Sequence, residues 1–264
     1  MTTPTTPTLC GLDELGDGLG RATTVLRANA GSAGLTTAVP TCPGWDVGDL
    51  VVHTGMVHRW AAANLAPPTP PDRRVDPEEL ERGGRDAADL LGWFDDGATA
   101  LLQALADAPD DLEVPVFLHA APPARLFWAR RQCHETTVHA VDALAARLGR
   151  CPTPEETWIR PSLALDGIDE LLRGFVPRAR QHVNPSRPTL LIVAPDDGPL
   201  AWRLDLHPDR PPAVERVAVG SSASSDHVLR GSAVELYLRL WSRSPAEPVD
   251  EVEQWWRDAV AVRW

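Results

Sequence analysis

Apolar residues recur at intervals of three and four positions through most of the first 150 residues. Residues spaced in this way lie on one face of an α-helix, so each such segment predicts an amphipathic helix. The segments cover residues 9–30, 46–64, 78–106 and 124–148. Helices of this length, joined by connections rich in proline and glycine, predict a helical bundle.

Local signals mark the ends of two of these helices. Asp46 precedes the second helix and can cap it, while Asp49 adds a carboxylate to the first turn, where the helix dipole is positive. Gly149 follows the fourth helix, as glycine often does at a helix C-terminus. Gly83 and Gly84 are expected to weaken or break the first turns of the third helix.

The pattern changes after residue 150, where we place a domain boundary. Three strand-like runs follow, the second with alternating apolar and polar residues, and a turn sequence at residues 196–198 predicts a hairpin between the first two. The expected strands are Thr189–Ala194, Ala201–His207 and Ala213–Val219, and the expected helices are Leu165–Arg180, Ser232–Arg243 and Val249–Ala259. We therefore predict an α+β protein, with a bundle at residues 1–150 and a smaller domain with an antiparallel sheet at residues 151–264.

Charge and composition exclude several classes of partner. The formal net charge is −12 and the pI is about 5.1, which argues against binding nucleic acid or an anionic membrane surface. No apolar run is long enough to span a bilayer, and the N-terminal residues do not resemble a signal peptide. The four cysteines have no metal-knuckle or redox spacing. We expect a cytoplasmic protein. Its basic residues are all arginine, a composition typical of many actinobacterial proteins.

The fourth predicted helix carries a pair of residues suited to metal binding. Glu135 and His139 are four positions apart, so they lie one above the other on the same helix face. His134 and His139 are five apart, about 140° around the helix, and cannot share a metal on one face. A Glu-x-x-x-His pair supplies two ligands, and a metal site needs at least a third.

His53 is the candidate for that third ligand. It falls on the apolar stripe of the second helix with Leu50, Val57 and Trp60. A histidine in such a stripe is more often a hydrogen-bonded core residue than a ligand. Helical bundles, however, build metal sites from side chains on facing helices. The bundle therefore favours a site made of one histidine from the second helix and a glutamate and a histidine from the fourth.

Three segments resemble the mycothiol-dependent maleylpyruvate isomerase family. They are PTCPGWDVGDLVVH (residues 40–53), ETTVHAVD (residues 135–142) and RGSAVELYLRLWSR (residues 230–243). The resemblance implies a DinB-like four-helix bundle that holds a divalent metal, usually zinc, followed by a smaller C-terminal α/β (sterol-carrier-like) domain. It implies His53, Glu135 and His139 as the ligands. The family includes isomerases and thiol S-transferases, so the reaction is less specified than the scaffold.

Two imidazoles and a carboxylate leave a coordination position open, which is typical of catalytic metal sites. The resemblance implies that mycothiol, a low-molecular-weight thiol, is deprotonated there to attack a small electrophilic substrate. An isomerase would release the thiol again, whereas a transferase would keep the adduct. Two alternatives remain. One is a hydrolase or lyase that uses water activated by the metal, with His134, His58 or Asp142 as base. The other is a metal-binding protein without catalytic activity.

The remaining candidates have structural interpretations beside the functional ones. Asp142, three residues after His139, is a candidate for orienting a ligand from outside the metal's coordination shell, although a solvated carboxylate on the helix surface fits equally well. Cys133 is expected to pack as a small apolar residue. Trp45 and Trp60 are interpreted as core residues. The sequence leaves the substrate-binding residues unassigned.

Overall fold

The computed structural model describes residues 8–66, 75–178, 185–219, 225–244 and 251–259. The chain divides into two compact units. One comprises Gly11–Val116 and Pro122–Pro152, and the other comprises Met1–Cys10, Phe117–Ala121 and Thr153–Trp264. We refer to them as the helical unit and the sheet unit.

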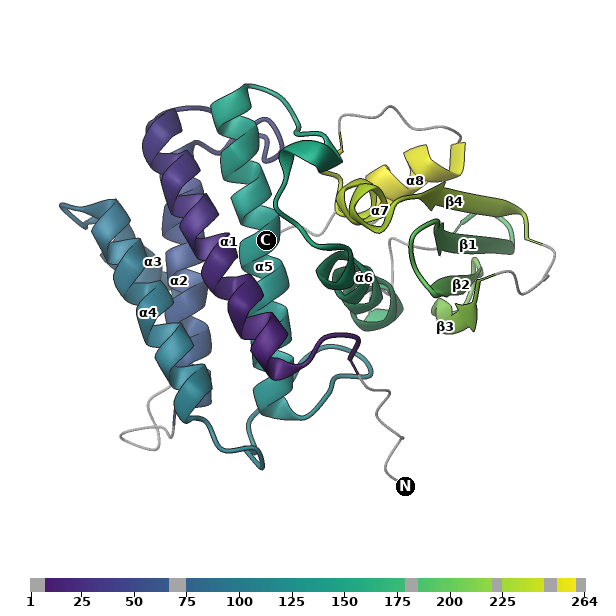
Figure 1. Cartoon of the computed structure of the whole chain (residues 1–264), viewed down its shortest axis with the longest axis horizontal. Coiled ribbons are helices and arrows are strands. Elements are labelled where there is room, and N and C mark those ends of the chain that lie inside the picture. Colours follow the sequence, from purple (N-terminus) through teal and green to yellow (C-terminus); the bar gives the residue numbers. More distant parts are fainter. Residues whose placement is uncertain (1–7, 67–74, 179–184, 220–224, 245–250, 260–264) are drawn as a thin grey trace. The chain divides into compact units, whose positions relative to one another are not determined.

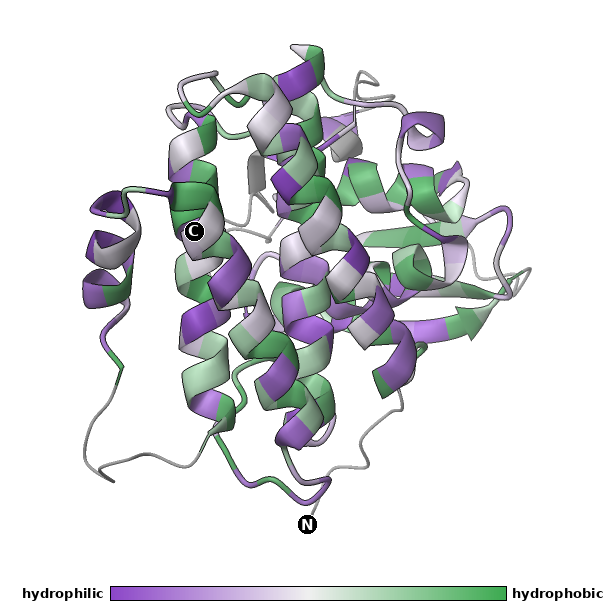
Figure 2. Ribbon diagram, turned by 60° about the vertical axis from the view of Figure 1, so that its left-hand side comes forward, coloured by the Kyte–Doolittle hydropathy of each residue, from purple (hydrophilic) through white to green (hydrophobic). Residues whose placement is uncertain are grey.

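The helical unit is built on long helices that run side by side (Figure 1). Its helices in the described residues are α1 (Leu12–Ala33), α2 (Val47–Leu65), α3 (Pro77–Arg85), α4 (Leu90–Asp107) and α5 (Ala124–Leu148). Helix α1 packs on α5, and α2 packs on both α4 and α5. Figure 2 shows hydrophobic and hydrophilic residues alternating around these helices, as the sequence pattern requires.

The prediction of a single third helix is wrong, because residues 78–106 form two helices. Helix α3 ends after Arg85, and α4 begins after Asp89, whose side chain accepts a 3.0 Å hydrogen bond from the backbone N–H of Gly92. This cap satisfies a backbone donor that a continuous helix would have bonded internally. The break follows Gly83 and Gly84, where the sequence predicted weakness.

The predicted start of α2 is confirmed, and the segment before it forms a tight turn. The carboxylate of Asp46 accepts a hydrogen bond from the N–H of Asp49, and the side chain of Asp49 accepts one from the N–H of Asp46. This reciprocal pair is a capping box. Gly44 has φ of 91°, a conformation that glycine adopts without strain. The turn therefore fixes the direction in which residues 40–46 approach the helix.

Helix α5 is buried around its whole circumference from Phe127 to Ala146. Its buried residues include nine with polar or charged side chains. They are Arg130, Arg131, Gln132, His134, Glu135, Thr136, Thr137, His139 and Asp142. Buried polar groups are costly unless they are paired or bind something. The concentration of such groups on one helix points to a functional site around it. As predicted, the helix ends at Gly149, which adopts a left-handed conformation.

The sheet unit contains helices and, among the described residues, a four-stranded sheet in the order β3-β2-β1-β4 (Figure 1). The strands are β1 (Thr189–Pro195), β2 (Leu200–Leu206), β3 (Ala213–Ala218) and β4 (His227–Gly231). β1 and β2 form the predicted hairpin, and β2 pairs with β3 in antiparallel fashion. The prediction of an antiparallel sheet is nevertheless wrong, because β4 pairs with β1 in parallel. Residues 227–231 of β4 were not among the predicted strands.

Helices complete the sheet unit. The 3₁₀ turn η1 (Pro154–Glu156) comes first, followed by α6 (Pro161–Asp169), α7 (Ala233–Leu240) and α8 (Glu251–Ala259). Helix α6 continues through the π-helical turn η2 (Glu170–Phe175) and the 3₁₀ turn η3 (Val176–Arg178). Helix α7 packs on α6 and is capped twice, by Ser232 and by the hairpin residue Asp197. The first two residues expected in the last helix lie outside the described residues. Within the described residues, no helix combines the length and apolarity needed to cross a bilayer.

Candidate metal centre

His53, Glu135 and His139 lie together in the helical unit, where α2 faces α5. The Nε2 atom of His53 is 3.4 Å from Oε1 of Glu135, and the Nε2 atom of His139 is 3.3 Å from the same oxygen. Each of the three residues offers a ligand atom within 4.8 Å of the other two. Ligands bound about 2.0–2.1 Å from a tetrahedral zinc ion lie about 3.3–3.4 Å apart. The arrangement of the three side chains therefore fits a divalent metal.

The second oxygen of Glu135 is held by a buried arginine. Nη2 of Arg131, one turn earlier on α5, donates to Oε2 of Glu135 over 2.8 Å, and both side chains are almost completely buried. Burial alone would raise the pKa of Glu135, but hydrogen bonds to His139 and His53 and the charge of Arg131 together lower it. The glutamate is thus held as a carboxylate, with Oε1 directed toward the two histidines.

Asp142 orients the ring of His139 from the opposite side. Nδ1 of His139 is 2.9 Å from Oδ2 of Asp142, and both side chains are fully buried. Burial alone would lower the pKa of His139, but Asp142 and Glu135 together raise it. When Nδ1 donates to the carboxylate, Nε2 is left as the ligand atom. The interpretation of Asp142 as a solvated surface residue is therefore wrong.

Cys42 adds a third member to this chain of contacts. Its thiol donates to Oδ2 of Asp142 over 3.3 Å. Cys42, His139 and Asp142 also form a second group whose ligand atoms lie within 4.8 Å of one another. The separation between His139 and Asp142 is that of a hydrogen bond and is shorter than the separation expected between two ligands of one ion. We interpret this second group as a support for His139.

The indole of Trp45 covers the two histidines. Its centroid lies 5.1 Å from that of His53 and 6.2 Å from that of His139, with which it is stacked at 23°. The sequence reasoning assigned Trp45 to the core, whereas its side chain is only half-buried and lies beside the candidate ligands. The residue precedes the cap of α2, so the turn at residues 40–46 brings both Trp45 and Cys42 to the site. The sequence signal that could have placed these two residues at the site is a tryptophan and a cysteine in a glycine-containing turn shortly before the candidate ligand His53.

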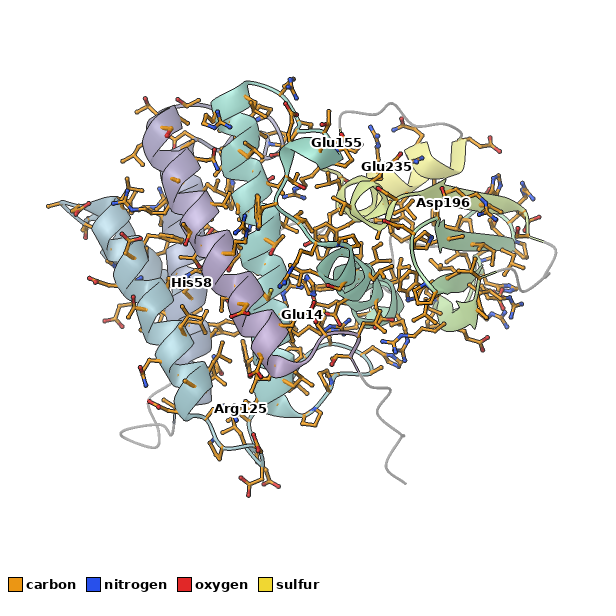
Figure 3. The ribbon with its side chains drawn as sticks, viewed as in Figure 1. Glu14, His58, Arg125, Glu155, Asp196 and Glu235 are labelled. Carbon is orange, nitrogen blue, oxygen red and sulfur yellow. The ribbon has the colours of Figure 1, made fainter. Side chains whose placement is uncertain are left out.

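The other histidines named as possible bases have different surroundings. His58 is buried among the bundle helices (Figure 3), and its Nε2 is 2.8 Å from Oγ1 of Thr136. Desolvation by burial lowers the pKa of His58 to about 3, so the ring is neutral at physiological pH. His134 is also buried, and neither group of potential ligands includes it. Asp142 is engaged with His139 and Cys42, which leaves the proposed hydrolase without a well-placed base among these three residues.

Comparison with known proteins finds a family model that matches most of the helical unit. Residues 17–144 match the family model of the mycothiol maleylpyruvate isomerase N-terminal domain. The chain is also similar to the crystal structure of the mycothiol-dependent maleylpyruvate isomerase, with a TM-score of 0.61, 15% identity, and coverage of 90% of this chain and 93% of that one. A histidine-to-alanine mutant of that isomerase gives the same TM-score and coverage at 14% identity. These likenesses confirm the α+β fold with a helical N-terminal part. Among curated proteins, no sequence matches the chain.

Proposed function

Because residues 17–144 of this chain match the family model of the mycothiol maleylpyruvate isomerase N-terminal domain, we propose that the protein is a metal-dependent enzyme that uses a low-molecular-weight thiol, mycothiol, to isomerise a small electrophilic substrate. His53, Glu135 and His139 hold the metal, which we propose to be zinc. The observation that carries the proposal is the convergence of these three side chains from α2 and α5, with both histidine Nε2 atoms at the distance from Oε1 of Glu135 that a tetrahedral ion requires of its ligands.

The donor set favours catalysis over a purely structural role. Two imidazoles and one carboxylate are three protein ligands, whereas structural zinc sites are closed by four. A zinc ion bound there would supply an open position at which a thiol could lose its proton near neutral pH. In an isomerase, addition of such a thiolate to a conjugated double bond of the substrate would allow rotation about the resulting single bond, and departure of the thiolate would restore the double bond in the other geometry.

The residues around the ligands have separate roles in this proposal. Arg131 holds one oxygen of Glu135, so that only the other oxygen faces the metal position. Asp142 fixes the ring of His139, with Cys42 donating to the same carboxylate oxygen. Trp45 covers the histidine rings and excludes water from one side of the site. A dry site strengthens the attraction between the cation and a thiolate.

The test is an assay of the zinc-loaded protein with mycothiol and a panel of cis-configured conjugated diacids and alkylating electrophiles. We expect conversion of a cis diacid to its trans isomer, with mycothiol recovered unchanged. Consumption of mycothiol in step with the substrate would identify an S-transferase instead. Turnover that does not depend on the thiol would favour the hydrolase or lyase, and zinc binding without turnover of any substrate would favour the non-catalytic protein.

A further inference from the structure

Gln132 is a buried polar residue that the metal centre does not use. Its side chain is 1% exposed, and its Oε1 atom has no hydrogen-bond partner among the described residues. The great majority of buried amides in folded proteins are paired, because an unpaired amide loses its hydrogen bonds to water without replacement. An unpaired buried amide oxygen beside a candidate catalytic centre is suited to accept a hydrogen bond from a bound ligand.

The neighbours of Gln132 on α5 show which way it faces. Trp128 lies four residues before it, and the ring of Trp128 is 5.1 Å from that of Trp60 on α2. Thr136 lies four residues after it, and its hydroxyl is bonded to His58 on α2. Residues four apart share a helix face, so Gln132 also faces α2, between these two contacts.

The same face of α5 carries the candidate ligands. Glu135 and His139 follow Gln132 by three and seven residues, so Gln132 lies slightly less than one turn, about 4.5 Å, from the glutamate along the helix. Across from it, His53, Val57 and Trp60 follow one another at steps of four and three on α2, and all three are only half-buried. The amide therefore lies close to the metal position along α5, on the side toward three partly exposed residues of α2.

We propose that Gln132 binds the amide group of the thiol cosubstrate. This inference rests on the proposed function. A thiol built on an acylated cysteine has an amide N–H three bonds from its sulfur. With the sulfur bound at the metal position, that N–H would come within reach of a side chain about one helical turn from Glu135. The carbonyl oxygen of Gln132 accepts from the N–H of the bound thiol, so that Gln132 selects thiols that carry an amide at this position.

The test compares two small thiols that differ only at that position. N-acetylcysteamine carries an N–H three bonds from sulfur, and 2-mercaptoethyl acetate carries an ester oxygen there. Dissociation constants are measured from the absorption spectrum of the full-length cobalt-substituted protein. We expect the wild type to prefer the amide thiol about fivefold to tenfold, the factor that one hydrogen bond provides. In Gln132→Leu the preference should fall to about one.

A matched control is Gln103→Leu, which removes an exposed amide from α4 and should retain the wild-type preference. The melting temperature supplies an independent readout. If the amide is kept for a ligand, Gln132→Leu should melt at a higher temperature than the wild type, because it removes an unpaired buried polar group. A structural role for Gln132 predicts a lower melting temperature. If the leucine variant loses cobalt, both measurements are repeated with Gln132→Met, whose side chain is similar in length to glutamine.

Two failures are distinguishable. If both thiols bind and the variants keep the wild-type preference, the role of Gln132 is refuted while the proposed function stands. If neither thiol perturbs the cobalt spectrum of the wild type, the thiol-dependent function is refuted, and the inference about Gln132 falls with it.

Discussion

Replacement of Asp142 tests whether the metal centre depends on the residues behind its ligands. Asp142 is fully buried, and its Oδ2 accepts from Nδ1 of His139 over 2.9 Å. A hydrogen bond to a charged group contributes about 1.5–3 kcal/mol, which corresponds to a factor of about 10–150 in binding. Loss of such partners in other metalloproteins weakens metal binding about 10–100-fold. We therefore expect Asp142→Ala to weaken zinc binding about 100-fold.

Asp142→Asn should have a smaller effect, about tenfold, because its amide oxygen can still accept from Nδ1 but carries no charge. Zinc affinity is measured by competition with a chromogenic chelator at fixed pH and salt. The matched control is Asp95→Asn on α4, where the carboxylate pairs with Arg27 and both side chains are nearly half-exposed (45% and 47%). Exposed pairs contribute little, so zinc affinity should not change. Dissociation constants within twofold of wild type for both Asp142 variants would refute the assigned role.

Three further outcomes follow from the same contacts. Arg131→Met should destabilise the metal-free protein by about 3–5 kcal/mol in urea unfolding, because it leaves the buried carboxylate of Glu135 without its cation; a change below about 1 kcal/mol would contradict this. Cys42→Ala should weaken zinc binding less than Asp142→Asn in chelator competition, because it removes only a hydrogen-bond donor to the carboxylate of Asp142. An equal or larger loss of zinc affinity would contradict the interpretation that Cys42 acts on the metal through Asp142 and His139. His58 has a lowered pKa in the folded state, so its contribution to stability is complete above pH 6.5 and is lost as the pH falls toward about 3. The free energy of unfolding of metal-free His58→Gln should therefore fall less steeply than that of the wild type over this range, by at most about 1.4 kcal/mol per pH unit, and parallel curves would refute the lowered pKa.

The features that the sequence predicted well depend on local geometry. Glu135 and His139 are four residues apart on one helix, so their shared face follows from the helical repeat alone. The capping box at Asp46 and Asp49 and the C-terminal Gly149 likewise involve residues close in the chain. The approach of His53 to Glu135 was a more demanding prediction, because it required two helices of a bundle to face each other.

The features that the sequence did not predict depend on contacts distant in the chain or on backbone details. The parallel pairing of β4 with β1 joins residues more than thirty positions apart, and a short strand of five residues carries too little pattern to reveal its partner. The positions of Trp45 and Cys42 depend on the turn around Gly44, whose backbone conformation the sequence alone does not specify. The burial of Asp142 depends on the packing around all sides of α5, which an amphipathic pattern does not predict.

The metal content of ligand variants tests the central claim most directly. Wild type, His53→Ala and His139→Ala are each loaded with zinc, passed through a desalting column and measured by elemental analysis, with circular dichroism as a check on helix content. The account predicts about one zinc per chain in the wild type and little or none in either variant, with most of the helix content retained. A full equivalent of zinc in both variants would contradict the assignment of His53, Glu135 and His139 as the metal ligands.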